Sequence, residues 1–509
     1  MLNRVFGANT HTYLHVLGLS GIAAGLPWSK VMMSISMMFL VLNLLLEANF
    51  RNYWQNIKQN RLFHIIFAFF VLHGVSFLWS ENMGYAIHDF KAKLPLLIIP
   101  LVLVAKPLYT KKHLHILLLV LVAIVFATSI VNFVYYQQWI GSVVYDDIRG
   151  MSLFSSHIRY ALLIVTSISI CIYFLKNYQR QRIALLLVIA WFIYYTIYSQ
   201  VIAGVIALIA MLFVTIFYLL WFRYKVLAFV FASISVIAAG IAIFWLFTPL
   251  KSTIYNTQTL PKFTAQGNPY SHQNGFISSE TGEPMLLYLC EKELEEEWNK
   301  RSRIPYDGKD IKGNKLHHTL IRYLSSKHLR RDASGVRTLT KTDIRNIERG
   351  FPSVHHNGIM ARLHGIRFEL NNSTNANGHS LLQRIEFWKT GLSIAKTHPL
   401  LGVGSGDVQD EFDKRYEAHN SILLPENRKR AHNMYLTVWI TFGIPGVVLF
   451  LSLIFNFLVV NFKERQLLGL LFMVIAMSSF LTEDTLETQT GVTFFALFYG
   501  LFQTKVPTA

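Results

Sequence analysis

The sequence predicts an all-α integral membrane protein with about 12 transmembrane helices and one large, mostly helical loop between the ninth and tenth spans. Three observations carry this prediction. Hydrophobic residues make up 53% of the 509 residues and charged residues only 15%, whereas soluble proteins carry about 25% charge. The apolar residues form long blocks of the length that a bilayer requires. Lysine and arginine concentrate in alternate short loops between these blocks.

Twelve apolar blocks are candidates for membrane-spanning helices. A helix needs about 20 apolar residues to cross a bilayer, within a range of about 17 to 25. The blocks at 94–105 and 491–503 are short by this measure, so the count is approximate. The blocks lie at 11–26, 30–47, 62–79, 94–105, 114–136, 157–175, 183–199, 201–221, 226–248, 434–460, 466–481 and 491–503.

The charges of the short loops set the expected orientation. With the N-terminus in the cytoplasm, the cytoplasmic loops hold most of the basic residues, as in 51–61, 106–112 and 176–182, and the closing loop on the other side holds acidic ones. The positive-inside rule predicts this alternation. The net charge of +18 therefore indicates membrane orientation rather than binding of nucleic acid. We expect no removable signal peptide, because the first ten residues hold one basic residue and no cleavage site follows the first apolar block.

The blocks divide the chain into three predicted parts. Residues 1–250 form an N-terminal transmembrane bundle of about nine spans, and residues 433–509 hold about three more. Between them, residues 251–432 form a large loop domain outside the cytoplasm, too long for a mere connection. Within it, 284–300 and 380–397 are predicted as helices, and 264–283 as turns or loose chain.

Two short patterns near the end of the loop domain could carry chemistry. Gly402, Gly404 and Gly406 form a glycine-alternating turn, which can bring backbone N–H groups close to an anion. A plain tight turn between helices is the alternative. His432 and Asn433 stand where the loop domain re-enters the membrane. A histidine at this point either acts as a general base or only anchors the helix end.

Four motifs in this region resemble those of one membrane-protein family. They are Arg384-x-x-x-Trp388, the His398 to Gly406 stretch HPLLGVGSG, His432-Asn433-x-Tyr-Leu, and Gly-Ile-Pro-Gly at 443–446. Together they resemble the O-antigen ligase and O-antigen polymerase family. The resemblance covers most of the chain except about 251–380, and it is most specific from 384 to 446.

The resemblance implies a metal-independent, inverting glycosyl transfer at the periplasmic face of the bacterial inner membrane, without a cofactor. The donor would be a glycan on undecaprenyl diphosphate, and the acceptor a hydroxyl of lipid A–core or of another glycan. The other partners would be membrane lipids. By match to the family's motifs, His432 would activate the acceptor hydroxyl, and Arg384 would hold the diphosphate leaving group.

One position departs from the family pattern. Gln200 stands where the family usually has an arginine near the external end of a middle span. The missing phosphate contact would then come from Arg149, Arg159 or a residue of the inserted segment. Gly402, Gly404, Gly406 and Asn433 complete the predicted substrate-binding set.

The resemblance points first to an O-antigen ligase, and three alternatives stay open. A polymerase and a protein O-oligosaccharyltransferase of the same family differ from a ligase in their acceptor, and acceptor choice would lie in the variable loop. A membrane transporter is the alternative from another class. It would place charges or broken helices in mid-span, whereas the predicted span interiors are nearly free of charge.

Overall fold

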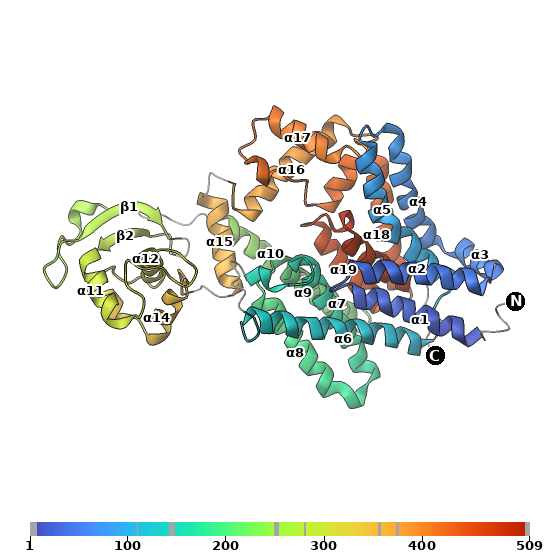
Figure 1. Cartoon of the computed structure of the whole chain (residues 1–509), viewed down its shortest axis with the longest axis horizontal. Coiled ribbons are helices and arrows are strands. Elements are labelled where there is room, and N and C mark those ends of the chain that lie inside the picture. The colour runs from blue at the N-terminus through green and yellow to red at the C-terminus, as the bar shows by residue number, and fades with distance from the viewer. Residues whose placement is uncertain are drawn as a thin grey trace. The chain divides into compact units, whose positions relative to one another are not determined.

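The computed structural model describes residues 8–108, 110–141, 148–248, 254–278, 281–354, 358–372 and 376–503. The chain divides into two compact units. The first consists of residues 1–233 and 376–509, and the second of residues 234–375. Figure 1 labels the main helices and strands of both units. The predicted boundaries at 250 and 432 concern the membrane surface, and they remain predictions.

Each of the twelve predicted blocks corresponds to a helix. The helices are α1 (Ala8–Gly25), α2 (Lys30–Glu47), α4 (Arg61–Val75), α5 (Met83–Ala105), α6 (Lys111–Tyr136), α7 (His157–Asn177), α8 (Arg182–Tyr198), α9 (Ile202–Trp221), α10 (Lys225–Phe247), α18 (Met434–Lys463), α19 (Leu467–Phe480) and α20 (Gln489–Phe502). Among the described residues, eight helical segments are long and apolar enough to cross a membrane. The all-α membrane fold is therefore confirmed, while the count of twelve spans stays a prediction.

The block predicted at 94–105 is only the second half of its helix. α5 begins at Met83, and its first half carries the buried residues Asp89 and Lys93. Both charges precede the predicted block, and the fold gives each of them a partner of opposite charge.

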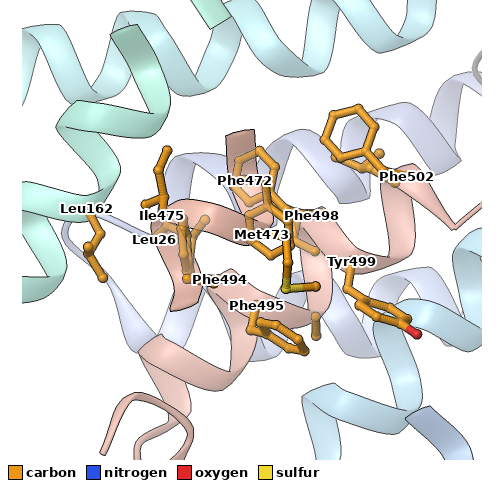
Figure 2. Close-up of a cluster of buried hydrophobic side chains, with 14 of the residues drawn as sticks. Leu26, Leu162, Phe472, Met473, Ile475, Phe494, Phe495, Phe498, Tyr499 and Phe502 are labelled. Carbon is orange, nitrogen blue, oxygen red and sulfur yellow. The ribbon is translucent and has the colours of Figure 1, made fainter. Parts of the chain in front are cut away.

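The core of the first unit is rich in phenylalanine and centres on α19 and α20 (Figure 2). Phe472 stacks on Phe498 with ring centroids 5.3 Å apart, and Tyr499 stacks on Phe457 at 4.8 Å. α20 packs closely against α5. Most of α20 is buried in protein, which explains why a helix of only 14 residues is stable there. Three further helices belong to this unit: α3 (Phe50–Gln59), α16 (Ser380–Thr397) and α17 (Val408–Ala418).

The helix predicted at 380–397 is confirmed as α16, which packs against α17 and α18. α18 carries a kink at Gly443, where φ is 63°, two residues before Pro445. The kink frees carbonyl groups of the preceding turn. The chain after α16 supplies donors to them: Val403 N–H bonds Ile440 O at 2.8 Å, and Gly404 N–H bonds Thr441 O at 3.0 Å.

The second unit has its own core and contains the only strands of the described residues. Its elements are β1 (Ser271–Ile277), β2 (Pro284–Leu289), α11 (Glu291–Arg301), α12 (Leu316–Ser326), α13 (Ala333–Thr338), α14 (Lys341–Glu348) and α15 (Ile359–Asn372). β1 and β2 form an antiparallel pair, and Trp298, Leu320 and Ile347 are fully buried among the helices.

Two predictions for this segment were wrong in part. Residues 284–289 form β2 rather than the start of a helix, and the stretch predicted as loose chain contains β1. A short apolar run such as MLLYL fits a buried strand or a buried helix equally well. Pairing with β1 decides the outcome, and this contact is not visible in the local sequence.

Candidate active site

Arg384 lies on α16 and reaches the loop between α19 and α20. Its Nη2 donates to Glu483 Oε1 at 2.8 Å, and its Nε donates to the Thr482 carbonyl at 3.2 Å. A third bond, from Nη1 to the carbonyl of Ser380, measures 3.3 Å. The guanidinium group is thus partly buried and fixed from two sides. Because guanidinium has five N–H donors, others remain for a ligand.

His432 directly precedes Asn433 and α18, and its backbone is left-handed, with φ 46°. This conformation costs about 1 kcal/mol or more for a residue with a Cβ. Asp484 stabilises it. The Asp484 carboxylate accepts the N–H groups of His432 at 3.0 Å and Asn433 at 3.1 Å, and the hydroxyl of Thr437 at 2.6 Å. Asp484 is itself buried, so its three hydrogen bonds fix the backbone of this turn. They thereby also fix the direction in which the His432 side chain leaves the backbone.

The carboxylate of Glu483 joins the two predicted catalytic side chains. One oxygen accepts from Arg384, and the other lies 3.4 Å from Nδ1 of His432. Burial raises the pKa of Glu483, but the neighbouring His432 and Arg384 outweigh burial, so the pKa lies below its ordinary value. The carboxylate is therefore charged at neutral pH. The structure brings Arg384 and His432 together; their catalytic roles stay predictions.

A second group of charges lies beside this site. Glu487 accepts from Lys93 at 2.7 Å and from Arg430 at 3.0 Å, and Lys93 also pairs with Asp89 at 3.1 Å. Burial raises the pKa of Glu487, whereas the charges of Lys93 and Arg430 lower it to about 2. The two cations balance the two anions, which makes their burial tolerable. Asp89, Arg430 and Glu487 line a small pocket together with His73 and Thr437.

The glycine-alternating turn packs the protein rather than presenting free amides. The N–H groups of Gly402, Gly404 and Gly406 donate to His398 O at 3.2 Å, Thr441 O at 3.0 Å and Ser80 Oγ at 3.1 Å. A Cβ on Gly402 would approach the backbone of residue 441 to 2.4 Å. The geometry thus favours the plain-turn alternative, because close packing against α18 and the 76–82 segment already requires glycine at these positions.

Asn433 and Gln200 have structural roles of their own. The Asn433 side chain caps α18 by accepting the N–H of Leu436 at 3.1 Å, and its Nδ2 donates to Leu481 O at 3.3 Å. Gln200 lies in the turn between α8 and α9 with φ 54°, and its N–H donates to Ile197 O. These contacts explain both residues without a substrate, so substrate binding by either stays a prediction.

Arg149 and Arg159 are the two other predicted phosphate contacts, and the structure describes the side chain of Arg159 but not that of Arg149. Arg149 lies in a short 3-10 helix (Ile148–Met151), and its side chain is outside the described residues. Arg159 lies in the first turn of α7, lines two pockets and interacts electrostatically with Glu483. Arg159 is therefore the one of the two that can be related to the site.

Sequence reasoning missed the acidic residues of the closing loop as site residues. Glu483, Asp484 and Glu487 were interpreted as markers of membrane orientation, yet each contacts a residue of the site or its neighbouring charge group. The sequence did indicate a site here, because three carboxylates lie within five residues between two apolar blocks. Membrane orientation does not require so many acidic residues. Arg430, a charged residue two positions before His432, could have been recognised as a site residue in the same way.

Among the described residues, no group of three or more His, Cys, Asp or Glu side chains is placed to hold a metal ion.

A family model described as O-antigen ligase matches residues 348–451. The matched segment contains Arg384, the glycine-alternating turn, His432 and the kinked first part of α18, whereas Glu483 and Arg159 lie outside it. No curated protein matches the chain. The matched segment is the same one in which α16 and the start of α18 present the paired arginine and histidine. The match supports the resemblance of this segment to the O-antigen ligase family.

Proposed function

We propose that this protein is an O-antigen ligase. It transfers a glycan from undecaprenyl diphosphate to a hydroxyl group of lipid A–core at the periplasmic face of the bacterial inner membrane. One observation carries the proposal: within and beside the family-matched segment, Arg384 and His432 meet at the charged carboxylate of Glu483. A base and a cation at one point are what a displacement at a sugar–phosphate bond requires.

The base in this reaction is His432. Its Nδ1 faces Glu483, which leaves Nε2 to accept the proton of the acceptor hydroxyl. The acceptor oxygen forms the new bond to the anomeric carbon while the bond from that carbon to the diphosphate breaks. The bonding pair leaves with the diphosphate, and attack from the opposite face inverts the anomeric centre. Glu483 stabilises the imidazolium that forms, as a carboxylate does beside a catalytic histidine.

The leaving group is stabilised by Arg384. A guanidinium group binds phosphate oxygens through two parallel N–H bonds, which fixes the group and neutralises its charge. In the free protein Glu483 occupies part of this fork. Because cationic side chains supply the neutralisation, we expect EDTA to leave the transfer rate unchanged. A strict requirement for a divalent ion would contradict this mechanism.

The proposal is tested in a deletion strain of the natural host, complemented with the wild-type gene or with His432→Ala. We expect the deletion to lose polysaccharide-capped core while lipid-linked chains keep their normal length, and His432→Ala to insert normally without restoring capping. Full capping by His432→Ala would refute the assigned base. Loss of long chains with single repeats still attached to core would identify a polymerase instead.

A further inference from the structure

The two contacts of Glu483 with Arg384 and His432 are unequal. Its Oε1 accepts from Nη2 of Arg384 at 2.8 Å, whereas its Oε2 lies 3.4 Å from Nδ1 of His432. An N–H···O hydrogen bond usually measures about 2.7 to 3.2 Å. Nδ1 of His432 is buried, and among the described residues it has no hydrogen-bond partner. In the free protein the carboxylate is therefore bound to the arginine and only close to the proposed base.

The longer contact leaves the tautomer of His432 open. A neutral histidine carries its proton on one ring nitrogen, and the hydrogen bonds of the ring decide which one. For Nε2 to accept a proton from a hydroxyl group, Nδ1 must carry the ring proton. A carboxylate that accepts from Nδ1 fixes this tautomer and orients the ring. Glu483 can do so once its Oε2 moves about 0.5 Å closer to Nδ1.

Arg384 holds the Glu483 side chain through only one of its own three bonds. Its Nε donates to the Thr482 carbonyl at 3.2 Å, and its Nη1 donates to the Ser380 carbonyl at 3.3 Å. These two carbonyls keep the guanidinium group in place if the bond to Glu483 breaks. The backbone of Glu483 is fixed as well, since its N–H donates to the Ser479 carbonyl at 2.9 Å. A change of partner therefore requires only a rotation of the Glu483 side chain.

An anion at Arg384 would drive this rotation. A diphosphate on the guanidinium group lies beside the carboxylate that shares it, and the two negative charges repel each other. The side chains of Arg384 and Glu483 are 23% and 17% exposed, so solvent screens the repulsion only in part. Glu483 also has other positive neighbours. His432 lies at its second oxygen, and Arg159 interacts with it electrostatically.

We propose that a diphosphate bound at Arg384 moves Glu483 from Arg384 to His432, and that this exchange of partners activates the base. The inference rests on the proposed function for the identity of the diphosphate, which is that of the polyprenyl donor. Glu483 is then a positioning residue with two partners in turn: the arginine in the free protein and the histidine in the donor complex. His432 becomes oriented to accept a proton only after the leaving group is in place.

The first test measures binding of undecaprenyl diphosphate to the full-length protein in nanodiscs of zwitterionic lipid. Glu483→Gln removes the charge that competes for Arg384, so we expect it to bind the diphosphate about fivefold more tightly than wild type. Transfer by the same variant should fall, because the base loses its carboxylate. Loss of a merely structural contact would not improve binding while it lowers the rate. Glu386→Gln, on the exposed side of α16, is the matched control and should bind like wild type.

A double-mutant cycle tests the second half of the exchange. His432→Ala removes the partner that receives Glu483, so it should weaken binding of the diphosphate about threefold. In the Glu483→Gln background the same change should have no effect, because no carboxylate is left to move. Equal effects of His432→Ala in both backgrounds would overturn the exchange. The thermal unfolding midpoint of each variant shows whether it is folded.

The outcomes separate this inference from the proposed function. Unchanged or weaker binding by Glu483→Gln would overturn the exchange, even if His432→Ala abolishes glycan transfer in the host. Tighter binding supports the exchange, even if the wild-type protein transfers no glycan.

If Glu483→Gln does not fold, a structure of the wild-type protein with bound undecaprenyl diphosphate decides. A distance below about 3.2 Å between Nδ1 of His432 and Glu483 would support the exchange. An unchanged contact between Arg384 and Glu483 would overturn it.

Discussion

Arg384 and His432 contact opposite oxygens of one carboxylate: Nη2 of Arg384 lies 2.8 Å from Glu483 Oε1, and Nδ1 of His432 lies 3.4 Å from Oε2. This shared contact ties the direction of the proposed base to that of the proposed phosphate ligand. Glu483 is thus a positioning residue for both, although it lies outside the family-matched segment. The first two predictions follow from this arrangement.

Glu483→Gln keeps the shape of the side chain and removes its charge. We expect kcat for glycan transfer to fall at least tenfold, because the imidazolium formed during proton transfer loses its stabilising anion. The rate is measured with purified protein and lipid-linked donor. Glu386→Gln is the matched control, since Glu386 pairs with the exposed Lys389 on α16. Equal rates for both variants would show that Glu483 has no part in catalysis.

Arg384→Lys keeps the positive charge and removes the guanidinium fork. We expect transfer to fall by more than tenfold, with a higher KM for the donor, because one ammonium cannot replace bonds to both Glu483 and the diphosphate. Arg415→Lys, on α17 and bonded to Ser393 and Thr397, controls for the general effect of the exchange. A wild-type KM in Arg384→Lys would argue against bidentate binding of phosphate.

Gly404→Ala should destabilise the protein. Gly404 has φ 92°, and an added Cβ would lie 2.3 Å from Ser80 Oγ and 3.2 Å from Trp79 Cδ1. We expect a loss of about 2 kcal/mol, seen as a lower thermal unfolding midpoint in detergent. Gly240→Ala, where no atom lies within 4 Å of the added Cβ, should instead be neutral or slightly stabilising. A lowered midpoint in both variants would show that the loss of stability does not come from the packing of Gly404 in its turn.

The ion pairs of Glu487 should survive mild acid. Its pKa is lowered from 4.5 to about 2, so the carboxylate is stabilised in its charged form by folding. The stability that it contributes is fully present above pH 4.5 and is lost as the pH falls toward 2.

The comparison of wild type with Glu487→Gln checks this expectation. Removing one partner of a buried pair costs about 3 kcal/mol, so the variant should unfold at a lower temperature at pH 7. The difference in midpoint should stay constant down to about pH 5 and shrink below it. A difference that disappears between pH 7 and pH 5 would contradict the lowered pKa.

The sequence determined the helical part of this fold. Each apolar block became a helix, because a long run of apolar residues must satisfy its backbone hydrogen bonds locally when it lies in lipid. The helix at 380–397 could also be predicted from the sequence. The meeting of Arg384 and His432 could be predicted as well, through the resemblance of their motifs to those of a family. These features depend on residues close together in the chain or on motifs that stand in the sequence.

The tertiary structure decided the rest. The β1–β2 pair, the partners of Asp89 and Lys93 within α5, and the packing role of Gly402, Gly404 and Gly406 depend on contacts made by distant segments. The same is true of the contact between Arg384 and Glu483, which are separated by 99 residues. Local sequence gives a carboxylate its charge, but only the folded bundle gives it a particular partner. Whether a charged residue orients a helix in the membrane or belongs to a site is therefore settled by packing.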